Sequence, residues 1–142
     1  MSKGKVLVIE DQIEWQSYLK EIIEDAGFYV EIVGDLESAL VKIKKEMYHC
    51  ITVDMRLSDV DDSLKLEGWN VLELVKNLRI DDRTSIIVIT GFPKDYNNLH
   101  KLKSINDLYM IDKGEFRSKL FIDILIREVN RFQLRFRNDH IN

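Results

Sequence analysis

Four short apolar segments, each followed at once by a polar or charged side chain, limit the possible folds of this chain more than any other feature. One of them, Cys50 to Val53, runs directly into Asp54. The other three end in the same way: Val6 to Ile9 before Glu10 and Asp11, Ile86 to Ile89 before Thr90, and Leu108 to Ile111 before Asp112 and Lys113. Short apolar runs of this kind predict buried strands. If the strands lie parallel in one sheet, the polar side chains that follow them converge at its carboxyl edge.

Apolar residues at helical spacing fill the intervals between these strands. Helices are predicted from about Gln12 to the closing Gly27, after the N-cap Asp35, from Gly68 to Arg79, from about Lys94 to Lys103 and from Glu115 to about Arg137, and Phe28 to Val33 is predicted as the remaining strand. Five strands alternating with five helices predict an α/β, doubly wound fold with a five-stranded parallel sheet. The strand order 2-1-3-4-5 would bring the four polar strand ends into one cleft.

Composition favours a soluble protein of one domain. The chain has 142 residues and a net charge of -4, whereas a nucleic-acid-binding domain would more often be basic. One cysteine, Cys50, excludes an internal disulfide, and no apolar run is long enough to span a membrane. We therefore expect a cytoplasmic protein with a domain over residues 1–127, and with residues 128–142 continuing the last helix without an output domain.

The polar strand ends form a set suited to phosphoryl transfer onto Asp54. Aspartate is a competent nucleophile for a phosphoryl group when positive charge is positioned beside the developing phosphoryl oxygens. Lys113 would supply an ammonium, and Thr90 would supply a hydroxyl donor. Mg²⁺ prefers oxygen ligands, so Asp11 and Asp54 are candidate direct ligands, with Glu10 binding through water.

Other interpretations of the same residues account for less of the pattern. Glu10 and Asp11 taken alone could simply cap the next helix. An aspartate-based phosphatase of the dehalogenase type should have a second aspartate two residues after the nucleophile, where this chain has Arg56. A flavodoxin should have a Ser/Thr/Gly-rich phosphate loop after the first strand, and the acidic residues after Ile9 have the opposite charge.

The four motifs resemble those of the receiver domain of two-component response regulators, the chemotaxis-receiver-like family. They are the acidic pair in Val8-Ile9-Glu10-Asp11, the phosphoacceptor in Val53-Asp54-Met55, the hydroxyl in Ile89-Thr90-Gly91 and the lysine in Asp112-Lys113-Gly114. They occur in the family's order, and the resemblance covers roughly Lys3 to Arg127. It implies the flavodoxin-like receiver fold.

The resemblance also implies a function. Asp54 would accept a phosphoryl group from a histidine kinase or a phosphotransfer protein, with Mg²⁺ held additionally by the backbone carbonyl of Arg56. Such a chain catalyses its own aspartyl phosphorylation and dephosphorylation, although it is mainly a signalling switch that acts on a protein partner. The alternative is a degenerate receiver that serves as a phosphorylation-independent interaction module.

The chain departs from the family pattern in three places. Ser58 replaces a usual proline, and the glycine that normally follows is delayed to Gly68 by a connection from Met55 that carries four acidic residues. This connection is expected to overhang the site. Gly114 replaces the proline after the lysine, and Met110, with Tyr109 before it, stands where an aromatic switch residue is usual.

The predicted last helix is longer than one edge of a sheet requires. Its apolar residues alternate at spacings of three and four, which is typical of a coiled-coil stripe: Ile122, Leu125, Val129, Phe132 and Phe136. A frayed tail is the simpler interpretation. Since exposed phenylalanines are unfavourable on a soluble monomer, we expect the helix beyond about Arg127 to pack against a second copy or another signalling protein.

Overall fold

The predicted strands form one parallel sheet in the computed structural model, which describes residues 3–56, 68–91 and 108–141 and the side chains of those up to residue 131. Within these ranges the strands are β1 (Lys5–Ile9), β2 (Tyr29–Val33), β3 (Cys50–Val53), β4 (Ser85–Thr90) and β5 (Leu108–Asp112). Their order is β2-β1-β3-β4-β5, and all four neighbouring pairs are parallel. The predicted fold class and strand order are therefore confirmed.

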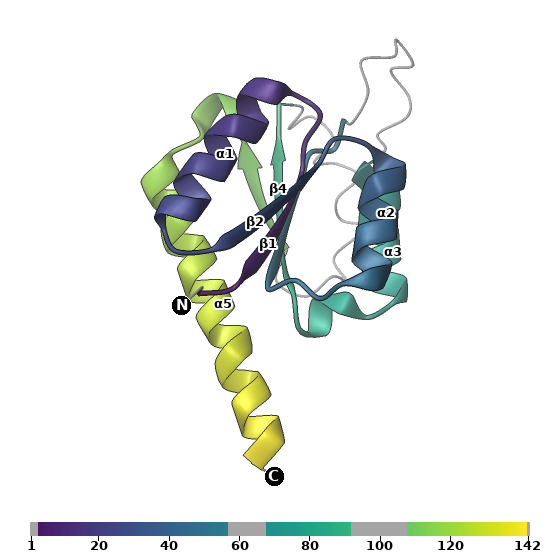
Figure 1. The fold of residues 1–142 in the computed structure, drawn as a ribbon, viewed down its shortest axis with the longest axis vertical. Coiled ribbons are helices and arrows are strands. Elements are labelled where there is room, and N and C mark those ends of the chain that lie inside the picture. The colour runs from purple at the N-terminus through teal and green to yellow at the C-terminus, as the bar shows by residue number, and fades with distance from the viewer. Residues whose placement is uncertain (1–2, 57–67, 92–107, 142) are drawn as a thin grey trace.

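Helices cover both faces of the sheet (Figure 1). They are α1 (Ile13–Asp25), α2 (Leu36–Lys45), α3 (Gly68–Asn77) and α5 (Ser118–Ile141), with short 3-10 turns η1 (Ile80–Asp82) and η4 (Lys113–Glu115). The helix predicted at residues 94–103 lies outside the described residues, as do residues 57–67 of the acidic connection.

Alternation along the strands divides the core into two clusters. On β1, Leu7 and Ile9 face α2 and α3, whereas Val6 and Val8 face α1 and α5. The same alternation continues along β3, β4 and β5, as expected when both faces of a parallel sheet are covered. Both clusters are closed to water, so the sheet is a rigid support for the side chains that follow its strands.

Two helix boundaries follow the local signals in the sequence. Asp35 caps α2, because its Oδ1 accepts a hydrogen bond of 2.7 Å from the backbone N–H of Ser38. Gly27 ends the turn after α1 with a φ of 98°, a conformation that side chains with a Cβ rarely adopt. Gly27 therefore determines how the chain enters β2, and Asp35 determines where α2 begins after that strand.

Two predicted boundaries move by a few residues. α3 ends at Asn77 rather than at Arg79, because Arg79 takes a left-handed conformation with a φ of 55°. α5 begins at Ser118 rather than at Glu115, because the chain first forms η4. The carboxylate of Asp112 accepts a hydrogen bond of 2.8 Å from the N–H of Gly114, which stabilises this tighter turn.

Gly68 is the first residue of α3, and it lies directly against the chain that follows β3. A Cβ at this position would lie 2.6 Å from Cα of Met55 and 2.8 Å from the carbonyl oxygen of Asp54. The N–H of Gly68 also donates to the Met55 carbonyl at 3.0 Å. The delayed glycine is therefore the point where α3 returns to the end of β3.

The last helix extends beyond the sheet and projects from the body of the molecule (Figure 1). Leu125 and Val129 are buried in the cluster beneath α1 and α5, so α5 packs against the sheet at least as far as residue 129. The side chains of Phe132 and Phe136 lie outside the described part of the chain. No helix in the described ranges combines the length and apolar character that crossing a bilayer requires.

Candidate functional site

Four of the residues predicted to converge lie together at the carboxyl edge of the sheet: Glu10, Asp11, Asp54 and Lys113. Asp54 follows β3 directly, and its backbone N–H donates to the carbonyl of Ile9 at the end of β1. Glu10 follows β1, and its own N–H donates to the carbonyl of Val33 at the end of β2. These bonds extend the parallel ladder by one residue and fix where both acidic side chains begin.

Lys113 ties the acidic groups together. Its Nζ lies 2.9 Å from Oδ2 of Asp54 and 2.8 Å from Oε2 of Glu10. All three side chains are well shielded from water, with exposed fractions of 10% for Lys113, 5% for Asp54 and 2% for Glu10. Because low solvent exposure strengthens attraction between opposite charges, the ammonium compensates for two carboxylates that would otherwise repel each other.

The carboxyl group of Glu10 is strongly perturbed by its surroundings. Burial, together with the negative charge of Asp54, raises its pKa to about 7. The hydrogen bonds from Lys113 and from the backbone N–H of Gln12 act in the opposite direction. The closeness of the carboxylates therefore carries an electrostatic cost, which a cation would relieve.

A group of three carboxylates offers such a cation a site. Glu10, Asp11 and Asp54 each present an oxygen, and these oxygens lie within 4.8 Å of one another. Hard divalent cations such as Mg²⁺ prefer oxygen ligands of this kind. The backbone carbonyl of Arg56 belongs to the same turn, in which the Arg56 N–H donates to Oδ1 of Asp54 at 3.2 Å.

Thr90 completes the predicted set at the end of β4, between β3 and β5. It is fully buried and aligned with Asp112, the residue before Lys113. At the next residue, Gly91, a Cβ would meet no atom of the described residues within 4 Å. Gly91 itself therefore adds no side-chain atoms beside the end of β4.

Lys113 has two further contacts that the sequence did not predict. One is with Gln12, just before α1, and the other is with Trp15 of α1. The Gln12 side-chain carbonyl accepts a hydrogen bond of 3.1 Å from Lys113, and the Trp15 ring centroid lies 5.0 Å from its Nζ. A signal was present for Trp15, which follows Asp11 by four residues, about one helical turn. Gln12 directly follows the acidic pair and gave no such signal.

Tyr109 and Met110 point to opposite faces of β5. Met110 occupies the position of the usual aromatic residue and packs on the cluster beneath α2 and α3. Tyr109 faces α5, where its hydroxyl donates to the buried carboxylate of Glu128 at 2.8 Å. The guanidinium of Arg131 lies 2.9 Å from the same carboxylate. Tyr109 thus anchors β5 to the last helix, whereas the family position belongs to Met110.

Comparison with known families gives a direct match. The family model described as the response regulator receiver domain matches residues 6–124. This chain belongs to the response regulator receiver domain family. The residues matched include every member of the site, from Glu10 to Lys113.

Relatives of the receiver domain are found among transcriptional regulators. The transcriptional regulatory protein HprR of Escherichia coli is 26% identical over 116 residues, which are 82% of this chain and 48% of that protein. The acid tolerance regulatory protein ActR of Rhizobium meliloti is 30% identical over 87 residues, or 61% of this chain and 41% of that protein. The chain spans about half the length of the curated relatives it matches.

Solved structures share the fold of this receiver domain. A CheY-like receiver domain protein from Methanospirillum hungatei superposes with a TM-score of 0.74 at 21% identity, covering 92% of this chain and 97% of that one. The receiver domain of a sensor histidine kinase from Pseudomonas aeruginosa gives a TM-score of 0.71 at 22% identity, covering 89% and 98%. That domain was crystallised with a magnesium ion coordinated in its active site cleft.

Proposed function

We propose that this receiver domain accepts a phosphoryl group on Asp54 from the phosphohistidine of a histidine kinase or a phosphotransfer protein. The observation that carries the proposal is the ion pair of 2.9 Å between Asp54 and Lys113, beside the buried carboxylate of Glu10 and the half-buried one of Asp11. A carboxylate held beside an ammonium at the carboxyl end of a strand is poised to become an aspartyl phosphate.

In the proposed reaction, a carboxylate oxygen of Asp54 attacks phosphorus and forms the new O–P bond. The P–N bond of the phosphohistidine breaks, and its electron pair remains on the imidazole nitrogen. Lys113, which pairs with Asp54 before the reaction, then pairs with a phosphoryl oxygen. The Thr90 hydroxyl would donate to another phosphoryl oxygen. Hydrolysis of the aspartyl phosphate later returns the Asp54 carboxylate and releases phosphate.

The donor set fits Mg²⁺, because three carboxylates converge within 4.8 Å and the charge of Lys113 balances only part of their sum. Asp11 and Asp54 would bind the ion directly, Glu10 would bind through water, and the Arg56 carbonyl would complete the protein ligands. When bound, Mg²⁺ supplies positive charge beside the phosphoryl oxygens. The residues of the chain provide orientation and a shielded environment.

The proposal extends to the role of the chain in signalling. A receiver of this kind would act as a cytoplasmic switch whose phosphorylated form is recognised by a protein partner, without binding nucleic acid or membrane itself. A degenerate receiver that docks without phosphorylation is the alternative. The presence of all the site residues at one sheet edge favours the phosphoacceptor.

Intact mass measurement after incubation with acetyl phosphate and Mg²⁺ tests the proposal. We expect the wild-type chain to gain one phosphoryl group, the Asp54→Asn variant to gain none, and addition of EDTA to abolish the gain. Asp35→Asn is the matched control, because Asp35 lies at the same sheet edge and asparagine keeps the helix cap. A wild-type chain that stays unmodified, or equal modification of Asp54→Asn, would favour the docking module.

A further inference from the structure

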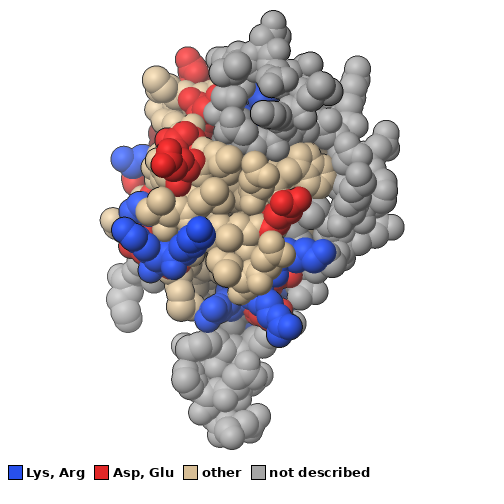
Figure 2. Space-filling view, turned by 90° about the vertical axis from the view of Figure 1, so that its right-hand side faces the viewer, with Lys and Arg blue, Asp and Glu red and all other residues tan. Residues whose placement is uncertain are grey.

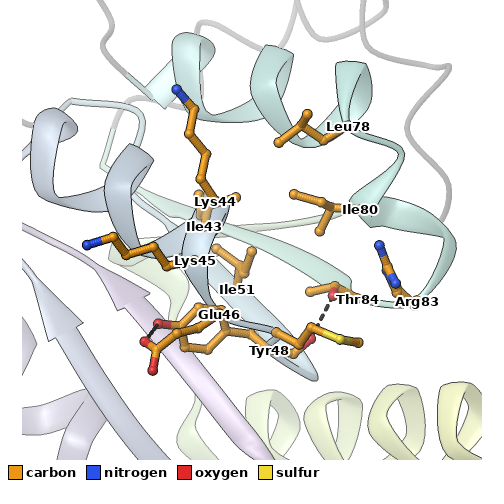
Figure 3. Close-up of a pocket in the computed structure, with 11 residues that line it drawn as sticks. Ile43, Lys44, Lys45, Glu46, Tyr48, Ile51, Leu78, Ile80, Arg83 and Thr84 are labelled. Carbon is orange, nitrogen blue, oxygen red and sulfur yellow. Dashed lines mark hydrogen bonds between the residues drawn. The ribbon is translucent and has the colours of Figure 1, made fainter.

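A pocket of about 270 Å³ lies at the amino edge of the sheet, the edge opposite Asp54. It is formed by the end of α2, the segments that lead into β3 and β4, and the residues after α3. In Figure 3, Ile43 and Ile51 lie deep in the pocket, with Leu78 and Ile80 on its opposite wall. Pockets for whole small-molecule ligands measure about 300 to 1,000 Å³, so this one suits a single large side chain.

The walls of the pocket are held in place by hydrogen bonds. The Thr84 hydroxyl donates to the carbonyl of Tyr48 at 2.6 Å, which joins the segments before β3 and β4. The hydroxyl of Tyr48 lies 2.8 Å from a carboxylate oxygen of Glu31 and 2.9 Å from one of Glu46. A pocket that exists before its ligand arrives avoids part of the ordering cost of binding.

Basic side chains surround this apolar centre. Lys44 and Lys45 lie on one side of the pocket and Arg83 on the other (Figure 3), and none of the three has an ion pair with another described residue. The one acidic residue of the lining, Glu46, is paired with Lys5 and Lys42. The space-filling view shows a largely uncharged area of this face, with basic groups along its lower border and acidic groups on its other sides (Figure 2). On a chain with a net charge of -4, the lining of the pocket has a local excess of positive charge.

The mouth of the pocket carries apolar side chains that solvent can reach. Met47 is 64% exposed and Leu78 is 46% exposed. Exposed apolar groups beside a deeper apolar pocket are typical of a surface that a larger partner covers, with one anchoring side chain inserted at the centre. The surrounding cations require that the partner be negatively charged around its anchor.

We propose that this pocket binds an acidic segment of a partner protein, which inserts one large apolar side chain between Ile51 and Ile80. The flanking carboxylates of the segment pair with Arg83 and with the lysines at the end of α2. The site is independent of Asp54, so it offers the receiver domain a second contact surface that does not compete with phosphoryl transfer.

Titration of the isotope-labelled full chain with the capped peptide acetyl-Glu-Glu-Phe-Glu-Glu-amide tests the proposal by NMR. We expect saturable shifts of the Ile51, Leu78 and Ile80 resonances at low ionic strength. Two comparison peptides separate the two parts of the claim: alanine in place of phenylalanine removes the anchor, and lysine in place of glutamate reverses the flanking charge. Both should bind at least about fivefold more weakly, and about 1 M salt should weaken the parent peptide.

Two variants with matched controls locate the binding. Leu78→Ala and Arg83→Glu should each weaken binding about fivefold or more. Leu120→Ala and Lys119→Glu make the same chemical changes at exposed positions of α5 and should leave binding unchanged. Because all four residues are exposed, the spectrum of each free variant should remain that of a folded chain.

Three outcomes would overturn the proposal. They are the lack of saturable shifts at the pocket, equal binding of the lysine-flanked peptide, and equal weakening by the α5 controls. Saturable binding of decanoate in the absence of peptide binding would instead identify a site for small amphipathic anions.

Discussion

At the scale of single residues, the ammonium of Lys113 explains how two carboxylates can be buried side by side. It donates to Glu10 and Gln12 in the segment after β1 and to Asp54 after β3. Each bond replaces part of the hydration that the buried ammonium has lost. These contacts keep the Lys113 ammonium within reach of the phosphoryl oxygens that Asp54 would carry after the proposed phosphorylation.

A second residue, His49, is expected to make stability depend on pH. Its Nδ1 accepts a hydrogen bond of 2.9 Å from the backbone N–H of Lys5, so the imidazole must be neutral there. Burial lowers its pKa below the ordinary value of 6.5. A lowered pKa in the folded state means that the unfolded chain binds more protons, so this contribution to stability is lost as the pH falls below about 6.5.

Urea unfolding of the wild-type chain and of His49→Asn between pH 5 and pH 8 checks this prediction. Asparagine keeps an acceptor near the Nδ1 position but does not titrate. The stability difference between the two chains should therefore be constant above about pH 7 and should shift in favour of the variant at lower pH. Parallel stability curves over the whole range would contradict the role assigned to His49.

At the scale of elements, the start of α3 is coupled to the end of β3 by direct backbone contact. Gly68 packs so closely on Asp54 and Met55 that α3 can begin at this place only without a Cβ. The identity of residue 68 therefore affects the position of the proposed phosphoacceptor as well as that of the helix.

We expect Gly68→Ala to destabilise the chain by about 1–3 kcal/mol, because the added methyl group must displace backbone atoms in a packed region. Gly91→Ala is the matched control: in the part of the chain that the structure describes, no atom lies within 4 Å of a Cβ there, so its cost should stay within about 0.5 kcal/mol. Urea unfolding measures both changes. Equal stability of the two variants would show that the turn after β3 relaxes freely.

At the scale of the whole molecule, α5 has two parts with different surroundings. Its first part covers the sheet through Leu125 and Val129 and is tied to β5 by the hydrogen bond between Tyr109 and Glu128. Its second part projects from the domain (Figure 1). The apolar stripe of the sequence continues there with Phe132 and Phe136, so we propose that this part packs against a second copy or another signalling protein.

Light scattering at micromolar concentration should then report a dimer of the full chain. The double variant Phe132→Glu with Phe136→Glu should weaken the dimer about tenfold or more, because charges replace the apolar stripe. Asn130→Asp with Asn138→Asp adds the same charge on the opposite side of the helix and should leave the dimer intact. A monomer in all three chains, without a partner in a pull-down, would support the interpretation of a frayed tail.

Much of this protein is determined locally along the chain. The period of the apolar residues predicted the five strands and the four α-helices that the structure describes, and the polar residues at the strand ends predicted that Asp54, Thr90 and Lys113 share one edge of the sheet. Residues at the carboxyl ends of parallel strands must share an edge, so the site followed from the alternation of strands and helices. Local caps such as Asp35 and Gly27 were also evident, because they act on their own turns.

Other features depended on contacts between distant segments. The burial of Glu10 and the approach of Gln12 to Lys113 require β1 and β5 to be placed around β3, which no local pattern describes. Which of Tyr109 and Met110 faces the last helix depended on the orientation of β5 relative to α5. The pocket at the amino edge of the sheet likewise brings together Lys45, Leu78 and Arg83 from separate elements. Periodicity specifies which side of an element is apolar, but only the packed structure specifies which residues from other elements meet it.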